Sequence, residues 1–159
     1  MEIRPARQED VAAWLELARE VEPLFGPMVE DPVFREALYT AVNDGRAVCA
    51  VEGERLCGAA AVSRDENALA WLAVASDRRG TGLGRALAEA ALELLDASRP
   101  ASVETFAPET AEGEAARRLF LSLGFEDRER RGTNPAGFPT WRMERPAAPE
   151  EPGEMEEQE

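Results

Sequence analysis

A run of three glycines and two arginines is the part of the sequence best suited to binding a phosphate group. It reads Arg79-Gly80-Thr81-Gly82-Leu83-Gly84-Arg85 and lies between a predicted strand and a predicted helix. Glycines leave the backbone open where an anion must come close. The first amides of a helix have no partner within it and attract negative charge, and the two arginines add to that attraction. The run therefore predicts a site for a cofactor pyrophosphate.

Two other kinds of nucleotide-binding loop do not match this run. A Walker-type loop needs a Lys-Ser or Lys-Thr pair after its last glycine, but Arg85-Ala86 follows Gly84. A Rossmann loop follows the first strand of a parallel unit, whereas this run stands in mid-chain after three strand-like segments. A glycine-rich turn alone is weak evidence, so the surrounding elements must decide its meaning.

Side chains for other kinds of catalysis are few. The chain has no histidine, which excludes Ser-His and Cys-His nucleophile pairs, an imidazole base and histidine metal ligands. Its two cysteines, Cys49 and Cys57, lie in apolar strand-like runs at a spacing unlike that of a metal site. We expect two buried free thiols and no metal centre.

The hydrophobic pattern predicts the elements that position the glycine run. Strands are expected near 3–6, 47–51, 56–62, 69–74, 101–106, 125–130 and 140–145, and helices near 9–21, 31–44, 83–95 and 116–123. Pro23, Gly26 and Pro27 are expected to break the first helix, and Asp31-Pro32 to begin the second. The order contains no internal repeat and predicts one α/β domain over residues 1–145.

Composition narrows the class of protein. The 159-residue chain has no apolar run of the ~20 residues that a membrane span needs, and its N-terminus has no apolar signal core. The net charge is −14, and the acidic tail, residues 146–159, holds six glutamates and no base, so the rest of the chain carries −8. This charge disfavours nucleic acid and membrane as partners and suits a cationic or amine substrate. We expect a cytoplasmic protein with a disordered tail.

Two segments together resemble the signature of the GNAT superfamily of acetyl-CoA-dependent acetyltransferases. Arg79, Gly82 and Gly84 meet its pattern Gln/Arg-x-x-Gly-x-Gly/Ala, and residues 116–125 resemble a second hallmark, a helix ending in Leu-Tyr-x-x-x-Gly-Phe. The element order also fits, so the likeness covers roughly residues 3–145. It implies a mixed, mostly antiparallel central sheet that is splayed beside the glycine loop, with helices on both faces.

The resemblance also implies how acetyl-CoA, the cosubstrate, binds. Backbone groups of Leu72 and Val74 pair with its pantetheine arm, and amides from Arg79 to Arg85 hold its pyrophosphate. The thioester lies in the splay, where an amine attacks the carbonyl directly and no covalent enzyme intermediate forms. An amide of Leu72 or Val74 stabilises the carbonyl oxygen. Family members are often dimers, so a homodimer stays open.

The sequence departs from the family at both proton-transfer positions. Phe120 occupies the cofactor-binding position of a tyrosine that often protonates the leaving thiolate, and Leu69-Ala70-Trp71 stands where a carboxylate often precedes the loop. The remaining candidates for catalysis are Tyr39, which is the only tyrosine, Glu104, Glu30 and Asp31. Each also has a structural interpretation: packing for Tyr39, solvation for Glu104 and helix capping for Asp31.

The sequence says less about which residues bind the acceptor. The apolar, turn-rich segments 25–29 and 134–139 either shape an acceptor pocket or only connect their neighbours, and Trp71 either packs in the core or walls that pocket. The leading hypothesis is an N-acetyltransferase for a small-molecule or peptide amine. The missing tyrosine and carboxylate leave open a non-catalytic acyl-CoA-binding or regulatory module. The intact glycine loop argues against a scaffold that has lost the cofactor.

Overall fold

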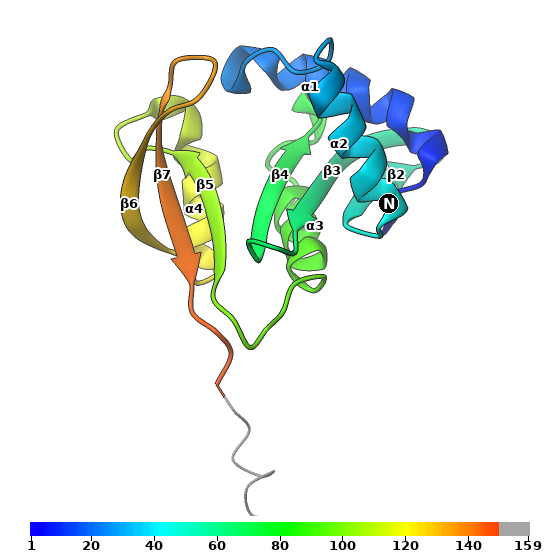
Figure 1. Ribbon diagram of the computed structural model, residues 1–159. Coiled ribbons are helices and arrows are strands. Elements are labelled where there is room, and N and C mark those ends of the chain that lie inside the picture. Colours follow the sequence, from blue (N-terminus) through cyan, green and yellow to red (C-terminus); the bar gives the residue numbers. More distant parts are fainter. Residues whose placement is uncertain (150–159) are drawn as a thin grey trace, which may run out of the picture.

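Seven strands form one sheet in the order β1-β2-β3-β4-β5-β7-β6 in the computed structural model, which describes residues 1–149 (Figure 1). The strands are β1 (Glu2–Pro5), β2 (Ala47–Glu52), β3 (Arg55–Ser63), β4 (Ala68–Val74), β5 (Ala101–Phe106), β6 (Glu126–Thr133) and β7 (Pro139–Arg145). Every neighbouring pair is antiparallel except β4 and β5, which run parallel. The predicted mixed, mostly antiparallel sheet is therefore confirmed.

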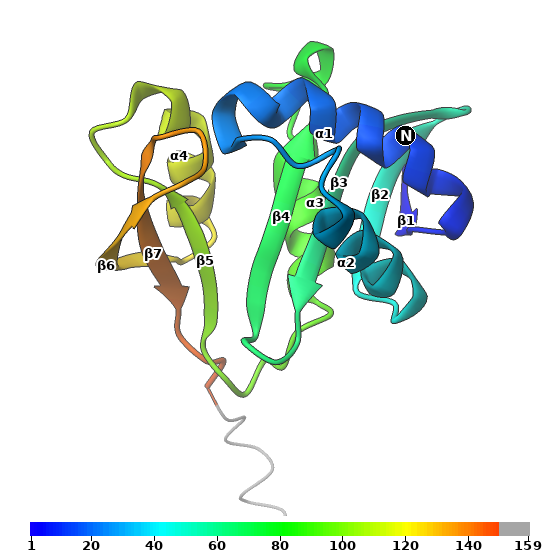
Figure 2. The same cartoon turned by 45° about the horizontal axis from the view of Figure 1, so that its top comes forward.

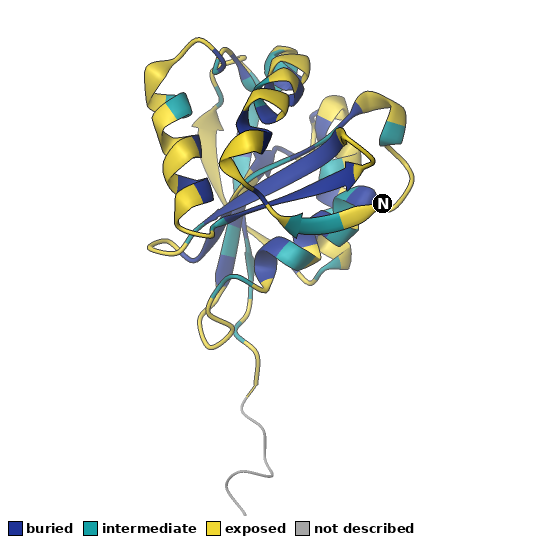
Figure 3. Ribbon diagram, turned by 90° about the vertical axis from the view of Figure 1, so that its right-hand side faces the viewer, coloured by how far each residue is buried: buried dark blue, intermediate teal, exposed yellow. Residues whose placement is uncertain are grey.

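Helices cover both faces of this sheet (Figures 1 and 2). They are α1 (Val11–Phe25), α2 (Pro32–Asn43), α3 (Leu83–Leu92) and α4 (Glu114–Ser122). Residues alternate along a strand between the two faces, so Cys49 packs with α1 and α2 while Ala50 packs with α3. Figure 3 shows the resulting buried central strands and the exposed outer sides of the helices.

The first helix is longer than the sequence predicts. Pro23 was expected to break it, but α1 continues through Pro23 to Phe25 and ends at Gly26, whose φ is 101°. A proline inside a helix removes one i→i−4 backbone bond, and only two residues of α1 follow Pro23. Packing compensates for that loss, because the Phe25 ring stacks on Phe106 of β5 with centroids 5.6 Å apart.

The sheet is splayed between β4 and β5. The two strands pair only at Ala68 with Ser102 and at Leu69 with Val103. On its other edge β4 pairs Trp71 with Ala61 and Leu69 with Val62, so Ala70 forms a bulge. A bulge bends its strand and increases the twist. Beyond it, β4 and β5 separate in the direction of the glycine loop (Figure 2).

Several other expectations concern features outside the sheet. Cys49 and Cys57 are free and buried, as predicted, and burial raises the pKa of the Cys49 thiol to about 11. No helix within residues 1–149 is long and apolar enough to cross a membrane. Most of the acidic tail, residues 150–159, lies outside the described part of the chain.

Candidate active site

The glycine run forms the turn between β4 and α3. Gly80 and Gly82 have φ angles of 77° and 86°, a region that residues with a Cβ rarely adopt. Gly82 is the N-cap of α3, and no side chain of the described residues bonds to this helix end. The amides of Leu83, Gly84 and Arg85 are therefore available to a ligand. Together they make the start of α3 a site for an anion.

Three contacts hold the segment that leads into these glycines. They are the Ser76 N–H to a Glu20 carboxylate oxygen at 2.6 Å, Arg55 to Asp77 at 2.6 and 2.7 Å, and Arg78 to Glu52. Arg78 is thus neutralised. Arg79 forms no ion pair among residues 1–149, and its Nε donates to the Val74 carbonyl at 3.4 Å. Its charge remains available to a bound phosphate.

Arg85, the second cation of the run, is already engaged in two contacts. Its Nη1 donates to Ser122 Oγ at 2.8 Å, and its Nε lies 3.7 Å from a Glu89 oxygen. Gly84 has more room than its sequence position suggests. A Cβ added there would lie 3.7 Å from both Val74 and Leu119, which is an ordinary contact. Alanine would therefore fit at this position, as the signature pattern allows.

The edge of β4 that faces the splay carries backbone groups that pair with no strand beyond Leu69, although the Val74 carbonyl accepts the bond from Arg79. The N–H of Ala75 donates to the carbonyl of Cys57 on β3 at 2.8 Å, and residues bonded to a neighbour alternate along an antiparallel strand. Leu72 and Val74 therefore direct their N–H and C=O groups away from β3 and toward the splay. This is the orientation that pairing with a pantetheine arm requires.

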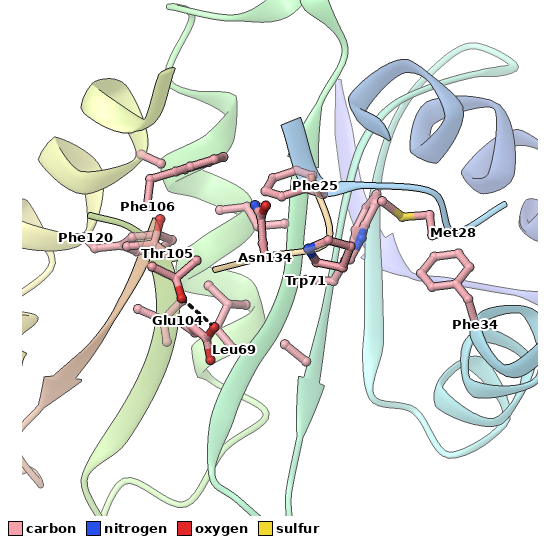
Figure 4. Close-up of a pocket in the computed structure, with 16 residues that line it drawn as sticks. Phe25, Met28, Phe34, Leu69, Trp71, Glu104, Thr105, Phe106, Phe120 and Asn134 are labelled. Atoms are coloured by element: carbon pink, nitrogen blue, oxygen red, sulfur yellow. Dashed lines mark hydrogen bonds between the residues drawn. The ribbon is translucent and has the colours of Figure 1, made fainter. Parts of the chain in front are cut away.

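A cavity of about 420 Å³ fills the splay (Figure 4). Residues 69–72 of β4 form one wall and residues 103–106 of β5 form the opposite wall. Phe120 of α4 also contributes, and only 4% of its surface is exposed because it packs against Phe125 at a centroid distance of 5.7 Å. The lining is mostly apolar, so a bound thioester would be shielded from water.

The two apolar loops singled out in the sequence meet at this cavity. Asn134 Nδ2, between β6 and β7, donates to the Leu24 carbonyl of α1 at 2.9 Å. A Cβ added to Gly26 would lie only 2.5 Å from the Cβ of Pro135, so this contact leaves no space for a side chain. Figure 2 shows the end of α1 reaching toward that loop. Both loops contribute lining residues, which supports their interpretation as walls of a pocket.

Glu22 holds the first of these loops in place. Its carboxylate accepts the N–H groups of Met28 and Val29 at 2.8 and 2.9 Å. These two bonds hold the pKa of Glu22 below its usual range. Because Met28 lines the cavity, this carboxylate positions part of the cavity wall.

Glu104 is the only titratable side chain among the described residues that line the cavity. Thr140 Oγ1 donates to its Oε2 at 2.9 Å, drawn as the dashed line in Figure 4, and Arg131 Nε lies 3.8 Å from its Oε1. Glu104 also lines a second cavity of about 310 Å³, which Arg131 and Arg142 border. The carboxylate is half exposed to solvent.

The other candidates lie elsewhere. Tyr39 is 48% exposed on α2 and does not line the cavity. Glu30 is exposed 3.6 Å from Arg19, and Asp31 caps α2 by accepting the Val33 N–H at 2.9 Å. Of the four candidate groups, the fold therefore brings only Glu104 to the cavity.

Several lining residues were not identified from the sequence, Thr105 among them. Phe106 follows Glu104 by two positions, and strand alternation places both on one face, so this signal was available. Phe34 lies on the apolar stripe of α2, where helical periodicity by itself predicts core packing, yet it lines the cavity half-buried. Thr140 could not be found, because its contact with Glu104 depends on how β7 pairs with β5.

Comparison with known proteins identifies a family and a set of similar structures. A family model described as an acetyltransferase (GNAT) domain matches residues 17–146. No curated protein gives a significant match. A ribosomal-protein-alanine N-acetyltransferase from Brucella melitensis superposes with a TM-score of 0.70 at 22% identity, covering 92% of this chain and 99% of that one.

Two further solved structures contain the cofactor or its product. The structure of yncA from Salmonella typhimurium with acetyl-CoA has a TM-score of 0.70 at 16% identity, covering 95% of this chain and 96% of the other. The structure of the NatC complex bound to Gag peptide and CoA has a TM-score of 0.68 at 20% identity, covering 93% of this chain and 100% of the other. At these identities the likeness establishes the fold, which is the one predicted.

Proposed function

Because the chain belongs to the GNAT acetyltransferase family, we propose that it is an N-acetyltransferase that transfers the acetyl group of acetyl-CoA to an amine. The observation that carries the proposal is the splay between β4 and β5. It sets the free backbone edge of β4 and the Glu104 carboxylate on opposite walls of one cavity. The glycine loop follows at the end of the same strand, β4.

The chain's own groups meet the main needs of this reaction. The start of α3 and Arg79 bind the pyrophosphate of the cosubstrate. The N–H of Leu72 or Val74 donates to the carbonyl oxygen as negative charge develops on it. Glu104 accepts a proton from the amine, directly or through one water molecule. The amine then attacks the thioester without a covalent enzyme intermediate.

The leaving thiolate needs a separate donor, since Phe120 has none. Thr105 lines the same cavity and lies two residues after Val103, which packs on the side of α3 and α4. Its hydroxyl is therefore placed on the side of the sheet from which Phe120 approaches. We assign it the hydrogen bond that stabilises the thiolate before water protonates it.

A turnover assay tests this proposal. Purified protein is mixed with acetyl-CoA and a panel of primary amines, and free thiol is followed together with the mass of the acetylated product. We expect thiol release that depends on the added amine and matches product formation one to one. Thiol release at the same rate without any amine would contradict N-acetyl transfer.

Phe120 is the observation that favours a second function, a non-catalytic acyl-CoA-binding or regulatory module. A phenyl ring cannot protonate a thiolate, so the ordinary family mechanism lacks its acid here. The module would bind acetyl-CoA and release no thiol with any amine. Sustained turnover in the assay above would exclude it.

The Phe120→Tyr variant measures how far the missing general acid lowers kcat. The phenyl ring lines the cavity, so the added hydroxyl can donate to the thiolate, and we expect kcat to rise about tenfold, below the usual range for general acid catalysis. Calorimetry should give an acetyl-CoA dissociation constant within about twofold of wild type. Phe138→Tyr adds the same hydroxyl outside the cavity lining and serves as the control. A severe loss of acetyl-CoA affinity would contradict the placement of Phe120.

A further inference from the structure

Aromatic rings wall the cavity on both sides. On the side of β4, Trp71 lies against Phe34 of α2 with centroids 6.5 Å apart. On the side of β5, Phe106 stacks on Phe25 at 5.6 Å. Figure 4 shows these four side chains around the open space. Such walls favour an apolar ligand, and an aromatic one in particular.

Most polar groups of the wall are already satisfied. The side-chain amide of Asn134 is engaged at both its oxygen and its nitrogen. Its Oδ1 accepts the N–H groups of Ala136 and Phe138 at 2.9 and 3.1 Å, and its Nδ2 donates to the Leu24 carbonyl of α1. The Thr140 hydroxyl donates to Glu104. The carbonyl of Phe106 accepts a bond from Arg117 at 3.2 Å. These groups have little left to offer a ligand.

One carboxylate and one neutral donor remain at the acceptor side. The carboxylate is that of Glu104, whose neighbour Arg131 at 3.8 Å lies closer to Glu129, at 3.2 Å. The donor is the indole N–H of Trp71, which lines the cavity. No cationic side chain of the described residues lines this cavity, since Arg131 and Arg142 border the second one. The site can therefore neutralise a single ammonium group and no other charge.

Resting on the proposed function, we propose that the acceptor is a small primary monoamine with one apolar, aromatic body. Its ammonium group pairs with Glu104, and its body lies between the Trp71–Phe34 and Phe25–Phe106 pairs. A cavity of about 420 Å³, which the thioester end must share, is at the small end of the range for ligand pockets. The net charge of −14 favours the approach of a cation.

The transfer then balances without any further reactant. The ammonium loses a proton to Glu104, the amine nitrogen forms a bond to the acetyl carbon, and the carbon–sulfur bond breaks with its electron pair on sulfur. The proton held by Glu104 passes through solvent to the thiolate. Polyamines, amino sugars, free amino acids and peptides are poor acceptors, because their additional polar groups lose water and find no partner.

Two matched pairs of amines test the acceptor class. We expect kcat/KM for 2-phenylethylamine to exceed that for phenylalanine, and that for pentylamine to exceed that for 1,5-diaminopentane, each by about 30-fold. A tripeptide amide with an N-terminal alanine and glucosamine complete the series. Equal or faster turnover of 1,5-diaminopentane, glucosamine or the peptide would overturn the acceptor class.

A charge placed in the wall gives an independent test. Phe34→Asp adds a second carboxylate to the cavity, so the preference for pentylamine over 1,5-diaminopentane should shrink by at least about tenfold. Val33→Asp is the matched control, because Val33 is the preceding residue of α2, is 73% exposed and does not line the cavity. It should keep the wild-type ratio. A ratio of rates is insensitive to loss of folded protein, so an unchanged ratio in Phe34→Asp would contradict the proposal.

Acetyl-CoA titrations of the same samples separate this inference from the proposed function. If acetyl-CoA does not bind, or if no amine supports thiol release, the proposed function itself is wrong. If acetyl-CoA binds and a multiply charged amine is preferred, only the acceptor class is wrong.

Discussion

Gly82→Glu is expected to raise the acetyl-CoA dissociation constant by at least about 100-fold, as measured by calorimetry. Gly82 has a φ of 86° and directly precedes the open amides of α3. A glutamate there strains the backbone and places a carboxylate where the pyrophosphate must bind. The carboxylate repels the ligand and competes with it for the same amides.

Gly45→Glu provides the matched control for this variant. Gly45 lies in the turn between α2 and β2 with a φ of 71°, and, like Gly82, it has no atom within 4 Å of an added Cβ. Both variants therefore gain one negative charge and a comparable strain. We expect wild-type affinity from Gly45→Glu. Unchanged affinity in Gly82→Glu would overturn the assignment of the cofactor site.

Glu104→Gln is expected to lower kcat about 100- to 1,000-fold while the acetyl-CoA dissociation constant stays within about twofold. An amide keeps the shape of the side chain and its bond from Thr140 but cannot accept a proton. The loss should be largest at low pH, where the amine is most fully protonated. Steady-state kinetics from pH 6 to 10, together with calorimetry, measure both quantities.

Glu129→Gln is the control that distinguishes a catalytic role of Glu104 from the loss of an ion pair with Arg131. Arg131 contacts both glutamates, at 3.8 Å from Glu104 and 3.2 Å from Glu129, but Glu129 does not line the cavity. Its variant should therefore keep kcat within about twofold of wild type. A loss smaller than about threefold in Glu104→Gln would mean that solvent, and not this carboxylate, deprotonates the amine.

Local sequence determined the glycine loop and the elements around it. Glycines with positive φ, a helix that begins with open amides and a preceding apolar strand are features of a few consecutive residues. Together with the second motif at residues 116–125 and the order of the elements, they indicated a resemblance to the GNAT family, which in turn implied the splayed sheet and acetyl-CoA as the cosubstrate. The family match confirms the family, and the short pairing of β4 with β5 confirms the splay. The sequence also showed that Phe120 stands where the family often has a tyrosine.

Only the tertiary structure decided which residues line the cavity. Tyr39 and Glu104 were equal candidates in the sequence, yet one is exposed on α2 and the other lines the cavity. The bulge at Ala70 and the pairing of Thr140 depend on strand register, which periodicity alone does not specify. Asn134 bonds to Leu24 across 110 positions of the chain. Such contacts arise from packing between segments that are distant in the sequence, so the wall of the cavity could be known only from the fold.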